Sequence, residues 1–379
     1  MRYSLHFGLL AVVSFITAAY AFSKKRKIDK KRCVQIVTVI LTLFSGLRSW
    51  QIGDVFHYCA AYLDCNLDSW KLDFTSHDSV GTQLLYRAFG QLHLGFEVCL
   101  FCIAAFSAIT LGVLIFKYST SPYLSYLIYI AFGNYIFTFS VLKQTIAMGF
   151  ITLAMIAIIE AKPIRFYVFV GIAALFHAPA CVFLIAYIIA HKRIDFVYFL
   201  VLAITAIVIR IFRNEIVAVA ANLYYTEEVQ YSASEQFGGK FLIMLVILLG
   251  AAFLHPIKKT DITYRCFFNI IVVAAIIQSF SIYDNVFTRL ADYYFQFFVI
   301  FVPLVFDSRT RRISHSCEEE YSGYRIPQDI YVVGILAVTV FCILFYKQTL
   351  KGSTELLSQF NFCWEVNTPR SLDLLKEWK

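Results

Sequence analysis

Charged residues are scarce in this 379-residue chain. Asp, Glu, Lys and Arg make up 15% of it, whereas hydrophobic residues make up 60% and the mean hydropathy is +0.69. A chain with so little polar surface cannot coat a soluble globule of this size. The composition therefore predicts a protein whose main solvent is lipid.

The sequence also lacks the segments that mark several other classes of protein. No soluble domain, nucleotide-binding loop, low-complexity tract or nucleic-acid-binding module interrupts its apolar runs. Basic loops between those runs account for the net charge of +8, which favours anionic lipid headgroups and not nucleic acid as a partner. The ten cysteines are scattered, so we predict no metal site and no cofactor. Cys59 and Cys65 have a spacing that suits either a disulfide or one amphipathic helix.

What the chain does contain is a series of apolar runs, each about 17 to 23 residues long. The runs are continuous and do not alternate with period two, which predicts helices and not a barrel. We therefore expect an all-α polytopic integral membrane protein with a single membrane domain over residues 1–379. The ten predicted spans are Tyr3–Phe22, Cys33–Leu47, Phe96–Tyr118, Tyr123–Val141, Thr145–Glu160, Asp195–Phe212, Lys240–Pro256, Tyr264–Ile282, Leu290–Phe306 and Ile330–Tyr346.

Basic residues predict which loops face the cytoplasm. Lys24–Arg32 carries seven basic residues and one acid, so the positive-inside rule places it inside and the N-terminus outside. Charges follow the first run and do not precede it, so we expect this run to be a span and not a cleaved signal. The loop at residues 48–95 then lies outside. Its apolar spacing at Val55–Leu63 and Leu84–Leu94 predicts two helices in the membrane interface.

An eleventh apolar stretch, Ile164–Ala190, contains the string FHAPA in its middle. Pro179 disfavours helix at Ala178 and removes a backbone donor, which predicts a broken, re-entrant helix pair at residues 164–190. If this pair enters the membrane and returns, the acidic loop at 213–239 is a second outer loop, and the basic loops at 191–193, 258–265 and 309–325 lie inside, as their charges require. A polar tail at 347–379 follows the last span. The alternative is a proline-kinked helix that makes an eleventh span.

Polar and ionisable residues gather at the predicted outer ends of three spans. They are Arg48, Asp54 and Tyr58 in the first segment, Lys143 and Gln144 in the second, and Arg289, Asp292 and Tyr293 in the third. Three cations on one side suit the diphosphate of a lipid carrier, although residues at helix ends also snorkel to the surface. His177 lies at the predicted helix break, where it is either a core residue or lines a cavity as a general base or as a hydrogen-bond anchor for a substrate hydroxyl.

Five strings carry a resemblance to a known family. GLRSWQIGDVFHY, QLLYRAF, KQTIA, LFHAPA and TRLADYYFQF occur in that order between residues 3 and 306. Together they resemble the EpsG-like, Wzy-type polysaccharide polymerases of bacterial envelopes. Two positions depart from that pattern: Lys143 replaces the usual arginine, and Gln83 replaces a frequent glutamate.

The resemblance implies a GT-C-like fold in the bacterial inner (plasma) membrane, with the active site facing the periplasm or exterior. It implies that undecaprenyl-diphosphate-linked oligosaccharide units are joined by glycosyl transfer into O-antigen, capsule or exopolysaccharide. The sequence leaves open the sugars, the linkage and whether a chain-length-determining partner binds. The alternative functions are a lipid-linked oligosaccharide flippase or other transporter, and a membrane acyl- or other transferase. A transporter usually has broken helices in two corresponding halves, and this sequence shows one break.

From these considerations we predict roles for the polar residues. Arg48, Lys143 and Arg289 bind the diphosphate or stabilise it as a leaving group. Asp54 and His177 are candidates for accepting the acceptor's proton, and Asp292 is a third. Tyr58, Gln144 and Tyr293 are expected to contact diphosphate or glycan. For Asp54 the structural alternatives are an ion pair with Arg48 or a cap on the following helix.

Overall fold

The computed structural model describes residues 3–21, 26–65, 72–73, 78–193, 211–212, 215, 239–254, 261–282, 286–306 and 328–366. These ranges are helical, and the bridge between Arg48 and Phe362 is the only β-type pairing within them. They divide into two compact units. Unit 1 comprises residues 1–118, 126–187 and 344–379, and unit 2 comprises residues 119–125 and 188–343. The predicted all-helical class is thus confirmed.

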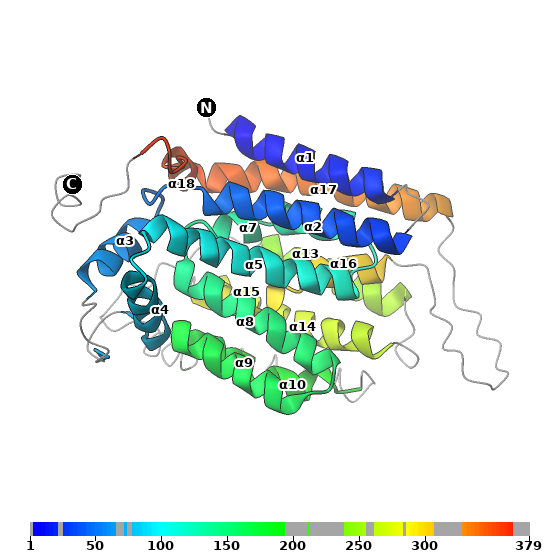
Figure 1. Ribbon diagram of the computed structural model, residues 1–379. Helices are drawn as coiled ribbons and strands as arrows, with labels where there is room; N and C mark the ends of the chain where they lie inside the picture. The colour runs from blue at the N-terminus through cyan, green and yellow to red at the C-terminus, as the bar shows by residue number, and fades with distance from the viewer. Residues whose placement is uncertain are drawn as a thin grey trace. The chain divides into compact units, whose positions relative to one another are not determined.

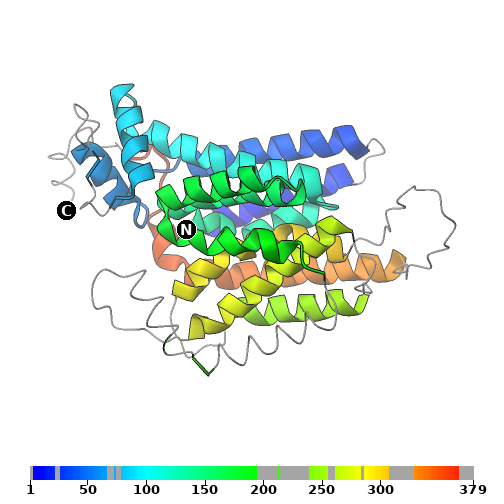
Figure 2. The same ribbon diagram turned by 90° about the horizontal axis from the view of Figure 1, so that it is seen from below.

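Unit 1 contains a row of helices that pack side by side in chain order (Figures 1 and 2). The row is α1 (Tyr3–Ala21), α2 (Arg26–Gly46), α5 (Phe96–Tyr118), α8 (Leu142–Ile159) and α9 (Pro163–Phe176). Helix α2 begins within the predicted basic loop, because lysine and arginine are good helix formers. Helix α8 is the most enclosed of the candidate spans, with 72% of its apolar window buried. Its apolar side chains therefore form much of the core of unit 1.

Two short helices lie at one end of this row, α3 (Val55–Asp64) and α4 (Val80–Gln91) (Figures 1 and 2). They occupy the two stretches whose spacing predicts helices, and Cys59 and Cys65 are free thiols there. We call this the motif end of unit 1, because Arg48, Lys143 and His177 all lie at it. Helix α2 ends here, α8 begins here and α9 ends here.

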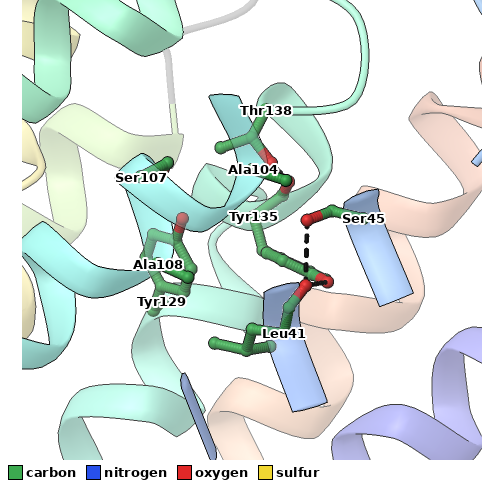
Figure 3. A pocket seen from close by; sticks show the side chains of 8 residues that line it. All are labelled: Leu41, Ser45, Ala104, Ser107, Ala108, Tyr129, Tyr135 and Thr138. Atoms are coloured by element: carbon green, nitrogen blue, oxygen red, sulfur yellow. Dashed lines mark hydrogen bonds between the residues drawn. The ribbon is translucent and has the colours of Figure 1, made fainter. Parts of the chain in front are cut away.

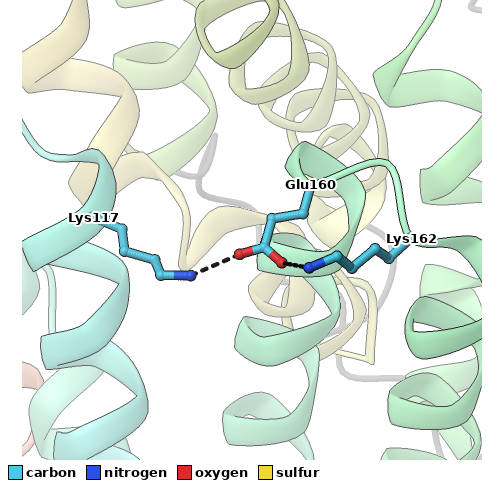
Figure 4. A network of polar contacts seen from close by, with 3 residues as sticks. All are labelled: Lys117, Glu160 and Lys162. Carbon is cyan, nitrogen blue, oxygen red and sulfur yellow. Dashed lines mark hydrogen bonds and ion pairs between the residues drawn. The ribbon is translucent and has the colours of Figure 1, made fainter.

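The opposite end of unit 1 carries a small ionic network (Figure 4). Lys117 Nζ lies 2.7 Å from Glu160 Oε1, and Lys162 Nζ lies 2.6 Å from Glu160 Oε2. Hydrogen bonds from these two lysines lower the pKa of Glu160 to about 2. Glu160 is therefore ionised at neutral pH and ties the end of α5 to the turn between α8 and α9.

The predicted break at FHAPA occurs at His177. Helix α9 ends at Phe176, His177 is extended (φ −149°, ψ 101°), and a 3-10 helix, η1 (Ala178–Ile185), leads into α10 (Ala186–Ala190). The ring of Phe166 lies 5.3 Å from that of Tyr187, so the two arms run antiparallel as a hairpin. Pro179 stands at the start of the second arm, where its missing N–H costs nothing. The placement of this hairpin in a membrane stays a prediction.

Several predicted spans are divided differently in the structure. Gly133, in the left-handed region with φ +80°, separates α6 (Pro122–Ala131) from α7 (Asn134–Phe137). Residues 290–306 likewise form parts of α15 (Val286–Phe295) and α16 (Phe298–Val305). The predicted span Asp195–Phe212 and the loops 213–239 and 309–325 lie largely outside the described residues.

Four described helical segments are long and apolar enough to cross a membrane. They are Phe96–Tyr118, Leu142–Ile159, Ile262–Ser281 and Val332–Gly352. Five further apolar segments are shorter, with 10–17 residues. The described part of the chain is therefore all-helical with segments suited to a membrane, and the count of about ten spans and the GT-C-like fold stay predictions.

Unit 2 is built around α14 (Ile262–Gln278), which packs with α13 (Gly239–Leu254), α15 and α16. A short 3-10 helix, η3 (Ser279–Ile282), follows α14. Helix α17 (Gln328–Gly352) begins in unit 2 and runs on beyond Tyr346, where its residues belong to unit 1, as does α18 (Thr354–Ser358), which follows it. Asn269 on α14 donates to the carbonyls of Ile189, Ala190 and Lys192, which satisfies backbone acceptors at the end of α10.

Candidate functional site

Arg48 lies just beyond the end of α2 and is 1% exposed. Its Nε donates to the carbonyl of Phe139 at 3.1 Å and its Nη2 to that of Thr138 at 3.3 Å, while Nη1 donates to that of Ser45. Helix ends leave carbonyls without partners, and arginine satisfies them well. Arg48 thus caps the ends of α2 and α7, and its predicted contact with diphosphate stays a prediction.

A small hollow lies between α2, α5, α6 and α7 (Figure 3). It is lined by Leu41, Ser45, Ala104, Ser107, Ala108, Tyr129, Tyr135 and Thr138. It has no space for a water-sized molecule. The hydroxyl of Tyr135 donates to the carbonyl of Leu41 at 2.7 Å across one side. This hollow is a packing feature and not a substrate site.

Asp54 is an exposed carboxylate at the motif end. It occupies the N-cap position of α3, but its side chain makes no capping hydrogen bond. Within the described residues it also has no ion pair with Arg48, whose donors point to carbonyls. Its N–H lies 3.5 Å from the hydroxyl of Ser140, near the start of α8. The structure therefore shows neither of the two structural alternatives for Asp54.

Lys143, in the first turn of α8, is held by an acid and an aromatic ring. Its Nζ lies 2.7 Å from Asp78 Oδ1 and 5.5 Å from the centre of the Tyr58 ring. The side chains of Lys143 and Asp78 are 19% and 17% exposed, so a solute can reach the pair. Asp78 was not among the predicted site residues, because no spacing rule connects it with Lys143, 65 positions away in the chain.

Gln83 fixes the backbone that carries Asp78. Its Oε1 accepts from the N–H of Asp73 at 3.0 Å, and its Nε2 donates to the carbonyls of Asp73 and Asp78 at 2.7 and 2.8 Å. An ionised glutamate accepts hydrogen bonds but donates none, so it would lose the second and third of these bonds. The glutamine at this position is therefore a positioning residue for Asp78.

His177 lies at the tip of the hairpin and is half-buried. Helix α4 packs closely against this tip, because Gly81 has no side chain to hold the helices apart. Gly81 lies three residues after Asp78, so the ion pair of Lys143 and the hairpin tip belong to one end of unit 1. Asp54, Tyr58, Lys143 and His177 are the predicted site residues that unit 1 gathers there with accessible surface, whereas Gln144 is fully buried.

Gly81→Ala is expected to separate α4 from the hairpin. A Cβ at Gly81 would lie 2.9 Å from the Leu175 carbonyl oxygen and 2.9 Å from Phe176 Cγ, so a helix must shift. We expect a destabilisation of about 1–3 kcal/mol, as for other overpacked sites, measured as a lower Tm of the purified protein. Gly171→Ala on α9 is the matched control, since its Cβ meets nothing within 4 Å. Equal Tm values for the two variants would contradict the close approach.

The third predicted segment forms α15 in unit 2. Arg289 is exposed on this helix, whereas Tyr293 is fully buried. Asp292 is paired with Lys240 of α13, with 3.0 Å between Nζ and Oδ1. Lys240 Nζ also lies 5.1 Å from the centre of the Phe295 ring. The roles of these three residues in catalysis or binding stay predictions.

A metal site requires several His, Cys, Asp or Glu side chains that lie close together. Among the described residues, no three His, Cys, Asp or Glu side chains gather closely enough to hold a metal ion. The accessible candidate groups at the motif end are the ammonium group of Lys143, the carboxylates of Asp54 and Asp78, the imidazole of His177 and the ring of Tyr58. Such a set binds anions and sugars and moves protons.

Comparison with known proteins gives one match. The model of the EpsG family matches residues 31–317, a segment that includes Arg48, the ion pair of Lys143, the hairpin and α15. The comparison with curated proteins and the comparison with solved structures found no match. Because the match spans well over half of the sequence, the chain belongs to the EpsG family, the family of Wzy-type polysaccharide polymerases.

Proposed function

We propose that this protein polymerises lipid-linked oligosaccharide repeat units into a surface polysaccharide. The observation that carries the proposal is the family match over residues 31–317. The contact of Lys143 with Asp78 and Tyr58 supports it, because Asp54 and His177 lie at the same end of unit 1 and an anion-binding group is thus combined with candidate bases. The proposed substrate is an oligosaccharide on undecaprenyl diphosphate, and the proposed location is the outer face of the bacterial inner membrane.

The proposed reaction is a glycosyl transfer. An acceptor hydroxyl oxygen at the non-reducing end of a new unit bonds to the anomeric carbon of the growing glycan. The bond between that carbon and the carrier's diphosphate oxygen breaks, and the diphosphate leaves with the electron pair. The hydroxyl proton passes to a base on the protein. The reaction needs charge stabilisation at the diphosphate and a proton acceptor near the sugar.

Residues of unit 1 are assigned to these tasks by their accessibility. Lys143 is the proposed diphosphate ligand, since it is a partly exposed cation and the acid beside it, Asp78, is also partly exposed. Asp54 is the first candidate base, because its carboxylate is exposed and makes no capping bond. His177 is the second, since it stands at the break of the hairpin. Arg289 on α15 is a further proposed diphosphate ligand.

The test uses a deletion strain, which lacks this protein, complemented with either the wild type or a variant. The length distribution of its surface glycan, seen as a ladder of bands, is the measurement. Wild type should restore long glycan, whereas Asp54→Asn and His177→Ala should leave single repeat units if both residues act in the reaction. Membrane levels of each variant must match the wild type. An unaltered ladder in the deletion strain would refute polymerisation. Repeat units trapped on the cytoplasmic face would instead identify a flippase.

A further inference from the structure

The segment after α17 returns to the motif end instead of leaving the protein. The N–H of Ser49 donates to the carbonyl of Asn361 at 2.6 Å, and the N–H of Cys363 donates to that of Leu47 at 2.8 Å. These bonds attach residues 361–363 to the GLRSW string on both sides of Arg48. Figure 1 shows α18 at the same end of unit 1 as α3. This segment lies beyond the part of the chain that the family model matches.

Aromatic packing fixes the returning segment to the core of unit 1. Phe360 is fully buried, with ring centres 5.3 Å from His6, 5.4 Å from Phe44 and 5.6 Å from Phe139. Leu357 is 2% exposed. Burial of these two apolar side chains stabilises the attachment of the segment to unit 1. The segment is therefore a built part of the motif end.

A second contact joins this segment to the turn before Asp54. Gly53 has φ +51°, and its N–H donates to Gln359 Oε1 at 2.9 Å. A Cβ at Gly53 would lie 2.7 Å from Leu356 Cδ1 and 2.7 Å from Ser140 Oγ, so only glycine fits between α18 and the start of α8. The segment thus sets the position of the loop that carries the candidate base.

A cavity of about 260 Å³ lies between this segment and residues 50–56, which lead from the GLRSW string into α3. Trp50, Gln51, Phe56, Gln359 and Asn361 line it. Gln359 Oε1 is used by Gly53, and Asn361 Nδ2 donates to the Gln359 carbonyl at 3.2 Å. Among the described residues, no partner holds the side-chain amide of Gln51, Gln359 Nε2 or Asn361 Oδ1. The cavity therefore offers donors and acceptors for a ligand.

The lining predicts the class of that ligand. Three carboxamides and two aromatic rings form the walls, and no lysine or arginine does. Carboxamides bind hydroxyl groups in both directions, and the half-buried ring of Phe56 can cover an apolar ring face, whereas Trp50 is 1% exposed and packs against Phe56. A diphosphate would require cations at this place. The chemistry therefore suits a neutral sugar, and the small volume suits about one sugar ring.

We infer that this cavity is a sugar-binding subsite, and that Gln359 and Asn361 select the sugar ring presented beside Asp54. The inference rests on the proposed function for the identity of the glycan, namely the repeat unit of the surface polysaccharide. It places a determinant of specificity outside the matched family segment.

The test is binding of free sugar to the full-length protein purified in detergent. The probe is the repeat-unit oligosaccharide released from the host's own glycan, without lipid or phosphate, and titration calorimetry measures Kd. Gln359→Glu keeps the acceptor for Gly53 but removes the donor, and Asn361→Ala removes the free acceptor. Each should raise Kd by about tenfold. Ser358→Ala, whose exposed side chain bonds only within α18, should bind like wild type.

The outcomes separate this inference from the proposed function. Wild-type binding that both cavity variants retain, or no binding by wild type, overturns the subsite even if the glycan ladder shows a polymerase. Displacement of the bound oligosaccharide by inorganic diphosphate would also overturn it, because the cavity would then be an anion site. The ladder of the deletion strain tests polymerisation alone. A variant that binds weakly counts as evidence only if its Tm equals that of wild type. If Asn361→Ala lowers the Tm, Gln359→Glu alone decides the test.

Discussion

Arg48→Ala is expected to abolish accumulation of the folded protein. The guanidinium of Arg48 is fully enclosed and donates to carbonyls at the ends of two helices. Hydrogen bonds to a charged group contribute about 1.5–3 kcal/mol each, and the variant loses several of them without a replacement partner. We expect a loss of about 3–5 kcal/mol, which is a large part of a typical stability of about 5–15 kcal/mol.

Membrane levels and Tm measure this effect. Arg48→Lys should be intermediate, because an ammonium group keeps the charge but lacks the planar fork that reaches three carbonyls. Arg165→Ala is the control, since Arg165 on α9 is exposed and has no proposed role in diphosphate binding. A different result would favour a role of Arg48 in substrate binding. If Arg48→Ala has a normal membrane level and Tm but makes no glycan polymer, Arg48 binds diphosphate as the sequence predicts.

Local patterns were sufficient for much of the helical architecture. The helical class, the break at FHAPA and the helices α3 and α4 follow from periodicity, proline chemistry and helix length, which act within a few residues. Gly133 divides residues 123–141 because its left-handed backbone ends a helix. Hydropathy alone does not register that division, since the residues on both sides are apolar. Element existence was therefore predicted better than element boundaries.

Pairings between distant segments could not be predicted in the same way. Asp78 meets Lys143, and Lys240 meets Asp292, only after packing has brought their helices together. The burial of Arg48 is likewise a tertiary result, since the sequence shows only a cation at a helix end. The polar composition after residue 347 predicts a tail, but the buried side chains of Leu357 and Phe360 attach that segment to unit 1. The apolar residues of the string LLSQFNFCW, residues 356–364, were the available signal.

Lys143→Ala is expected to reduce the glycan ladder to single repeat units without lowering the amount of protein. The ion pair with Asp78 is partly exposed, and such pairs contribute about 1 kcal/mol or less to stability. Loss of a group that stabilises charge in the transition state costs far more, about 10²- to 10³-fold in rate. The measurements are ladder length and membrane level in the deletion strain. Lys143→Arg should keep long glycan, because it keeps the cation.

Asp78→Asn distinguishes an anion-binding role of Lys143 from a purely structural role of its ion pair. In the structure the Asp78 carboxylate forms an ion pair with the ammonium group of Lys143, which we assign to diphosphate. Removing the charge of Asp78 should therefore make Lys143 more available to the diphosphate and preserve long glycan. A purely structural pair makes the opposite prediction, because both variants would then lower Tm by similar small amounts and leave the ladder unchanged. Loss of polymer in Lys143→Ala alone therefore identifies an anion site. Equal loss in both variants at normal protein level would instead show that the intact pair is required, and Lys143 would not act as a free cation toward the diphosphate.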